Sequence, residues 1–169
     1  MDDDAYRAGI AELYAAEVLG EGLASRWLEL CSDPDQKYKL ELFLQLESEA
    51  KVRLRPLLAR HGIDLAEDSR QRAAGAAAAE KFASMSWQEA MATLAELARP
   101  YLERFQALSV AATPEDLPMV SFMVAHEGAV IRIAEREAIG DASMDHEILT
   151  MLSYPLVRLG PRGADRAAI

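Results

Sequence analysis

Four residues place acid or imidazole groups where the surrounding helical pattern is apolar. Glu17 lies in line with apolar residues at helical spacing, and Glu47 interrupts a second apolar series about thirty residues later. His126 and Glu127 lie within a broad apolar arc farther along the chain. Because a carboxylate is costly to bury without a partner, these side chains must face either a metal ion or a compensating group of the protein.

A metal ion is the first explanation for this pattern. The candidate ligands are Glu17, Glu47, Glu127 and His126. Three carboxylates and one imidazole form an oxygen-rich set that suits iron or manganese, held as one ion or as an irregular pair. Glu49, on a neighbouring stripe, and Glu21 are second candidates for the same site.

The alternative is a buried polar network without metal. Lys51 follows Glu47 by one helical turn on the same face, so its ammonium could neutralise a carboxylate. His126 would then hydrogen-bond Glu17 or a neighbouring helix. A metal-free protein of this kind would bind a small apolar ligand or a protein partner. If Lys51 instead extends to the surface, the metal explanation is favoured.

Other acidic residues are weaker candidates. Glu135 and Glu137 lie close to Arg132 and Arg136, which is typical of a surface ion-pair ladder. Residues 145–147 have the composition of a ligand cluster, but adjacent positions on a short helix point in different directions. Neither group is predicted to form the site.

Helices must position the candidate residues. Ala, Leu, Glu and Arg dominate the composition, which predicts an all-α fold. The first helix should begin after Asp2–Asp4 and end near Cys31, and the second should run from Pro34 to about His61, where Gly62 ends it. The short connection between these two long helices predicts an antiparallel hairpin.

The second half of the chain repeats this organisation. The alanine-rich segment 65–83 is expected to be a helical connector with too few large side chains to anchor itself strongly. A capping box at 86–89 should start the third long helix, which Pro100 should kink or split. The fourth should start near 113–116 and end at Ile139, followed by a short helix at 143–152 and a mobile tail at 160–169.

Composition limits the kind of protein. At 169 residues the chain is expected to form a single domain, residues 1–169, with a sizeable core. The net charge of −10 argues against nucleic acid as a partner, and the apolar runs are too short to predict a membrane span. The single cysteine, Cys31, suits a reducing compartment, so we expect a cytoplasmic protein.

The segments 45–51 and 125–129, together with Glu17, carry a resemblance to a known family. The separation of 30 residues between Glu17 and Glu47, a long connector and a later Glu127 resemble the ferritin-like di-iron and di-manganese carboxylate proteins, among them rubrerythrins and bacterioferritins. The resemblance implies an antiparallel four-helix bundle with a long helical crossover connection, a short C-terminal helix, iron or manganese, and redox chemistry with dioxygen or peroxide. A homodimer is also expected.

The sequence departs from this family in its ligands. The family carries two Glu-x-x-His pairs, but Ala50 stands three residues after Glu47 and Val130 three residues after Glu127. The acidic residues of the third long helix lie away from its apolar stripe. The predicted metal site is therefore smaller than the six-ligand centre of the family.

Overall fold

The computed structural model describes residues 1–141 and 144–156, apart from the side chains of 144 and 145, and this part of the chain is all-helical. Its six helices are α1 (Asp3–Leu30), α2 (Pro34–Arg60), α3 (Ser69–Phe82), α4 (Trp87–Ala111), α5 (Leu117–Ala138) and α6 (Met144–Met151). The predicted tail at 160–169 lies outside the described residues.

Local signals in the sequence set the helix starts. The Asp2 carboxylate accepts a hydrogen bond of 2.8 Å from the backbone amide of Ala5, and the Asp33 carboxylate caps α2 in the same way. At α4 the predicted capping box is present, because Ser86 and Glu89 each bind the backbone amide of the other. The predicted starts of these three helices are confirmed.

Two details of the helices differ from the sequence predictions. α4 continues through Pro100 to Ala111, so of the predicted kink or split at Pro100 the split does not occur. The connector helix α3 begins at Ser69 rather than at Leu65, because the Asp68 carboxylate caps the backbone amide of Arg70 and the preceding residues are not helical.

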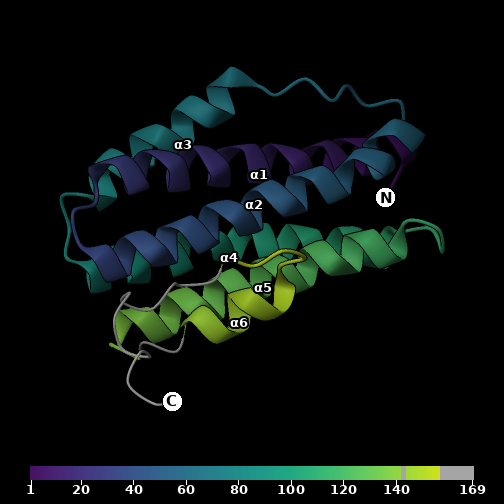
Figure 1. Cartoon of the computed structure of the whole chain (residues 1–169). Helices are drawn as coiled ribbons and strands as arrows, with labels where there is room; N and C mark the ends of the chain where they lie inside the picture. The colour runs from purple at the N-terminus through teal and green to yellow at the C-terminus, as the bar shows by residue number, and fades with distance from the viewer. Residues whose placement is uncertain (142–143, 157–169) are drawn as a thin grey trace, which may run out of the picture.

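The long helices pack in pairs. α1 packs against α2, and α4 packs against α5, while α3 lies along the other side of α1 and α6 lies against α2 and α5 (Figure 1). Contacts between α1 and α4 and between α2 and α5 join the two pairs. Side chains from α1, α2 and α5 can therefore meet in the interior.

α3 is anchored more closely than its composition predicted. A Cβ atom at Gly75 of α3 would lie 2.0 Å from the carbonyl oxygen of Leu19 on α1, and one at Gly22 would lie 2.5 Å from the carbonyl oxygen of Arg72. Only glycine allows two helix backbones to approach this closely. Close backbone contact thus replaces the large side chains that α3 lacks.

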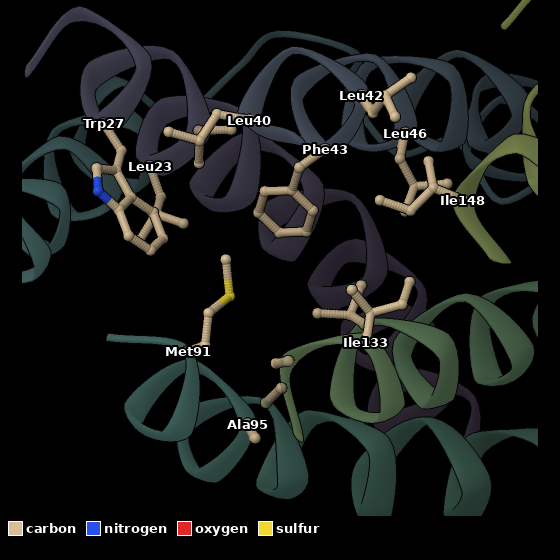
Figure 2. Close-up of a cluster of buried hydrophobic side chains, with 14 of the residues drawn as sticks. Leu23, Trp27, Leu40, Leu42, Phe43, Leu46, Met91, Ala95, Ile133 and Ile148 are labelled. Atoms are coloured by element: carbon tan, nitrogen blue, oxygen red, sulfur yellow. The ribbon is translucent and has the colours of Figure 1, made fainter. Parts of the chain in front are cut away.

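The apolar interior consists of two clusters, and the candidate residues lie between them. Figure 2 shows Trp27, Phe43, Met91, Ile133 and Ile148, which come from five helices, in the first cluster. The second cluster gathers residues such as Ile10, Leu54 and Met123. On α2 and α5, Glu47, His126 and Glu127 fall between the stretches that form the two clusters, and on α1 Glu17 precedes Val18, the last residue of the second cluster on that helix. The core therefore contains a polar layer.

α5 is long and apolar enough to cross a membrane by length and composition alone. Of its most apolar stretch, 56% is buried against the rest of the protein. Core helices of soluble proteins share these properties, and α5 carries one side of the polar layer.

Candidate metal centre

Three of the four leading candidates meet in the polar layer. Glu17 of α1, Glu47 of α2 and His126 of α5 each offer a ligand atom, and these atoms lie within 4.8 Å of one another. His126 Nε2 is 3.7 Å from Glu17 Oε2 and 3.7 Å from Glu47 Oε1. All three residues are buried, with at most 4% of their surface exposed. We call these three residues the Glu-Glu-His cluster.

Several polar atoms of the cluster have no hydrogen-bond partner. Within the described part of the chain, neither ring nitrogen of His126 is hydrogen-bonded, and Glu17 Oε2 is also without a partner. Leaving a buried polar group unsatisfied costs about 1–3 kcal/mol, and such groups are rare in folded proteins. The hydrogen bond from His126 to Glu17 that the metal-free network requires is thus absent, since 3.7 Å is too long for one.

The cluster fits a single metal ion. With metal–ligand bonds of about 2.1 Å, neighbouring ligand atoms lie about 3.0 Å apart in an octahedron and about 3.4 Å apart in a tetrahedron. The two distances of 3.7 Å exceed the tetrahedral value by a few tenths of an ångström, a difference that small rotations of the side chains would remove. Two carboxylates and one imidazole are a donor set that could hold a metal ion.

Burial determines the protonation of the cluster. It raises the pKa of Glu17 and Glu47 well above the ordinary value of 4.5, and the charges of Glu127 and Glu21 add to this effect. Burial also lowers the pKa of His126 to about 4, helped by the positive charge of Arg53. His126 is therefore a neutral imidazole at neutral pH, which is the form that binds metals.

Glu127 lies beside the cluster rather than in it. It is buried, and burial raises its pKa to about 7, although the charge of Arg104 acts in the opposite direction. It is absent from the group of three whose ligand atoms converge. The structure therefore brings together Glu17, Glu47 and His126, and leaves Glu127 as a neighbour.

Gly20 makes room for Glu47, a role that sequence reasoning missed. A Cβ atom at Gly20 would lie 2.0 Å from Glu47 Oε2 and 2.7 Å from its carboxyl carbon. No side chain could therefore stand at position 20 without moving the carboxylate. A glycine in the middle of a long helix, one turn from an inward-facing acid, was the available signal, because glycine is unfavourable there unless something requires it.

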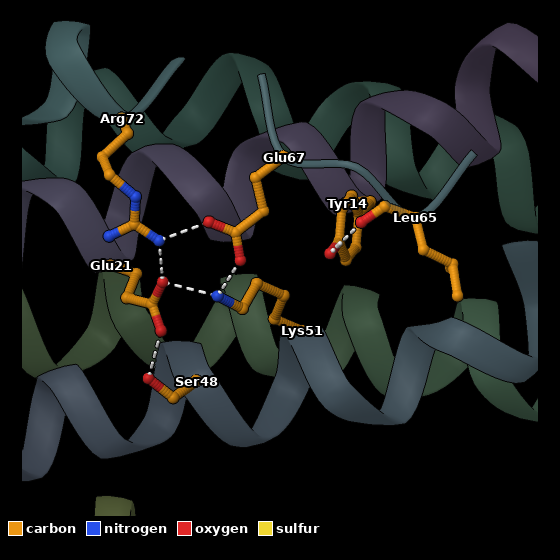
Figure 3. Close-up of polar contacts among 7 residues, drawn as sticks. All are labelled: Tyr14, Glu21, Ser48, Lys51, Leu65, Glu67 and Arg72. Atoms are coloured by element: carbon orange, nitrogen blue, oxygen red, sulfur yellow. Dashed lines mark hydrogen bonds and ion pairs between the residues drawn. The ribbon is translucent and has the colours of Figure 1, made fainter. Parts of the chain in front are cut away.

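Lys51 does not neutralise the cluster. Its ammonium is buried but lies 2.5 Å from Glu21 Oε2 and 2.5 Å from Glu67 Oε1, and Figure 3 shows it between these two carboxylates. The alternative in which Lys51 neutralises a carboxylate is confirmed for Glu21 and Glu67, but Glu47 is not among its partners. Lys51 is buried and does not extend to the surface, and extension to the surface was the condition that favoured the metal explanation, but its partners are Glu21 and Glu67, and Glu47 has no lysine partner.

Glu21 belongs to this second network and is unavailable as a ligand. It accepts hydrogen bonds from Ser48 Oγ at 2.6 Å, from Lys51 and from Arg72 (Figure 3). Burial alone would raise its pKa, but these three donors outweigh burial and lower the pKa to about 2. Because its oxygens already bind charged donors, Glu21 serves to hold Arg72 of α3 and Lys51 of α2 against α1.

The remaining second candidate, Glu49, also has other partners. Its carboxylate accepts hydrogen bonds from the backbone amide of Ser153 at 2.7 Å and from the Gln45 side chain at 2.9 Å. Burial would raise its pKa, but these donors outweigh burial and lower it. Glu49 therefore fastens the segment after α6 to α2 and does not reach the cluster.

The predicted ion-pair ladder on α5 is only partly present. Glu135 pairs with Arg99 at 2.5 Å on the surface, as expected for such a residue, although its partner comes from α4. Glu137 is buried and accepts hydrogen bonds from Lys39 Nζ at 2.6 Å and Trp87 Nε1 at 2.7 Å. It joins α2, α4 and α5 near one end, which the spacing of the sequence did not predict.

The other predicted ligand group is not a site either. Glu147 of α6 pairs with Arg132 at 2.7 Å, and His146 is exposed. The side chain of Asp145 lies outside the described residues. The described members of this group therefore point to different surroundings.

Another buried acid, Asp116, was not predicted from the sequence as a candidate ligand. Asp116 is 2% exposed and accepts hydrogen bonds from the Tyr6 hydroxyl at 3.1 Å and from Arg60 Nη2 at 2.8 Å. His61 Nε2 lies 2.8 Å from Asp116 Oδ2, the oxygen that also accepts from Tyr6. Here every partner is supplied by the protein, in contrast to the Glu-Glu-His cluster. Asp116 joins the start of α1, the end of α2 and the start of α5.

Comparisons with protein-family models, with curated proteins and with solved structures found no match to this chain. What the site can do therefore follows from its own geometry: a buried Glu17, Glu47 and His126 group that could hold a metal ion within an all-helical protein.

Proposed function

We propose that this protein binds one iron or manganese ion through Glu17, Glu47 and His126, and that it acts as a metal-carboxylate oxidoreductase. The observation that carries the proposal is the set of buried donor atoms without partners in the cluster. The diversion of Lys51 to Glu21 and Glu67 supports it, because no ammonium competes with a metal for Glu47.

We further propose a ferritin-like arrangement, in which α1, α2, α4 and α5 form an antiparallel four-helix bundle and α3 is part of the crossover. Two contacts support this topology. Trp87, at the start of α4, binds Glu137 at the end of α5. Tyr6, near the start of α1, and His61, just after the end of α2, both bind Asp116. In each pair, the start of one helix therefore lies near the end of the other, as an antiparallel arrangement requires.

Iron or manganese at this position would supply a redox-active centre for reaction with dioxygen or peroxide. The chain itself contributes a buried site, a neutral imidazole from His126 and two carboxyl groups that lose their protons when a cation binds. Its acidic surface and single cysteine are consistent with a cytoplasmic setting, and we extend the proposal to a homodimer on the same sequence grounds.

Metal analysis of protein purified without a metal-binding tag tests the proposal. We expect about one iron or manganese per chain, and a rise in melting temperature when Mn(II) is added to metal-free protein, because a ligand of the native state stabilises it by about 2.7 kcal/mol at 100 times its Kd. His126→Ala should abolish both effects, whereas Glu135→Gln, an exposed acid on the same helix, should retain them. Absence of metal together with absence of a thermal shift would refute the proposal.

A further inference from the structure

A hollow of about 90 Å³ adjoins the Glu-Glu-His cluster. It is lined by residues of α1 to α5, and small residues on α1, α3 and α4 leave the space open: Ala16, Gly20, Ala78 and Ala98. Leu97, which is 53% exposed, also lines it, so the hollow reaches the surface beside α4.

The wall of the hollow is almost entirely apolar. Among the described residues, the polar side chains that line it besides Tyr101 are three acids: Glu17, Glu47 and Glu127. Large apolar residues such as Phe43, Phe82 and Leu94 complete the wall. A concave apolar surface with a few convergent polar groups at one place is the usual form of a small-molecule site.

The polar part of the hollow is shared with the cluster. Glu17 and Glu47 contribute to both, whereas His126 belongs to the cluster and does not line the hollow. The two carboxyl groups therefore stand between the imidazole and the apolar space. A molecule in the hollow would contact the acids from one side while His126 approaches them from the other.

We propose that the hollow binds a small apolar molecule, with a hydrocarbon part of roughly four carbon atoms, whose inner end lies against Glu17 and Glu47. The size follows from comparison with an apolar cavity of about 150 Å³ that holds benzene. One consequence rests on the proposed function: the substrate of the metal centre would be small and apolar. The binding itself depends only on the hollow.

Fluorine NMR with 1-fluorobutane as the probe tests the inference. We expect saturable binding to the wild-type protein, and an affinity at least about tenfold lower for Ala98→Leu, because the added carbons fill the space. Ala78→Leu fills the same hollow from half-exposed α3 and provides a second variant if Ala98→Leu folds poorly. The matched control is Ala92→Leu, which adds the same carbons on the exposed face of α4.

The measurement separates this inference from the proposed function. In metal-free protein, binding that Ala98→Leu or Ala78→Leu weakens supports the hollow even if no metal is ever found. Adding Mn(II) should then broaden the resonance of the bound probe, because the ion would be adjacent. Absence of probe binding, equal binding to the filled variants, or tighter binding of butylammonium than of 1-fluorobutane would overturn the inference, whatever the metal analysis gives.

Discussion

Lys51 and Glu47 lie one turn apart on α2 and are both buried, yet they do not pair. The Lys51 ammonium lies between Glu21 and Glu67 at 2.5 Å from each, and Glu47 lies with Glu17 and His126 instead. The interior therefore contains two neighbouring polar networks, one around Lys51 and Glu21 and the other the Glu-Glu-His cluster, which differ in how their groups are paired. Around Lys51 each charged group is paired with an opposite charge. In the Glu-Glu-His cluster, Glu17 Oε2 and both ring nitrogens of His126 have no hydrogen-bond partner among the described residues.

Lys51→Met is expected to destabilise the fold without weakening metal binding. Removing the ammonium leaves Glu21 and Glu67 facing each other with only Arg72 between them, and breaking a buried ion pair costs roughly 3 kcal/mol. Urea denaturation measures the loss, and metal titration measures the site. If Lys51→Met instead increased metal affinity severalfold, Lys51 would be a partner of Glu47 in solution.

Glu17→Gln is expected to abolish metal binding and to flatten the pH dependence of metal-free stability. Because burial raises the pKa of Glu17, the folded protein holds a proton that the unfolded chain releases above pH 4.5. The free energy of unfolding of the wild-type protein should therefore fall as the pH rises from 4.5 towards the raised pKa, and this cost should be absent from the variant.

Denaturation of both metal-free proteins at pH 5 and pH 8 measures the difference. We expect the wild-type protein to lose stability over this range and Glu17→Gln to lose less, although not nothing, because Glu47 and Glu127, whose pKa values burial also raises, remain in the variant. Glu135→Gln, which removes an exposed acid, should follow the wild-type profile. A wild-type stability that rises with pH over this range would contradict a protonated, buried Glu17.

Gly20→Ala is expected to weaken metal binding at least about tenfold while leaving α1 helical. The new Cβ atom would lie 2.0 Å from Glu47 Oε2, so the carboxylate must move away from the cluster. Gly9→Ala is the matched control on the same helix, because its Cβ would also meet a side chain, that of Leu108 in the second apolar cluster, but no member of the Glu-Glu-His cluster. Equal metal affinity in the two variants, measured by titration, would show that Glu47 is not a ligand.

Glu21→Gln should make the protein less sensitive to acid. The donors around Glu21 lower its pKa to about 2, so its stabilising contribution is complete above its ordinary pKa of 4.5 and is lost as the pH falls from 4.5 towards 2. The contribution is roughly 2 kcal/mol for a side chain that is 14% exposed. Acid unfolding followed by circular dichroism should show a shallower transition in the variant, which is also less stable at pH 7.

The helices and the inward direction of the acids were predictable from local pattern. Asp2, Asp33 and the Ser86–Glu89 box cap helices through contacts within four residues, and the sequence contains both partners of each contact. The burial of Glu17, Glu47 and His126 followed from the apolar residues at helical spacing around them. Both kinds of prediction depend only on the geometry of one helix.

The sequence did not predict contacts in which a side chain meets a residue of another helix or segment. Glu67, in the segment before α3, draws Lys51 away from Glu47, and no periodicity connects residues 16 positions apart across a turn. Glu127 and His126 are neighbours in sequence, but only His126 is directed at Glu17 and Glu47, which depends on the rotation of α5 against α1 and α2.

The sequence by itself determined that the chain is helical, where most helices start and end, and that an acid, a second acid and a histidine face the interior. The tertiary structure decided which of these meet, that Lys51 serves Glu21 instead of Glu47, and that an apolar hollow opens beside the cluster. The reason is physical: helical propensity, capping and apolar spacing act over a few residues, whereas the separation of groups on different helices depends on packing. The close approach of α3 to α1 at Gly22 and Gly75 is one such packing contact.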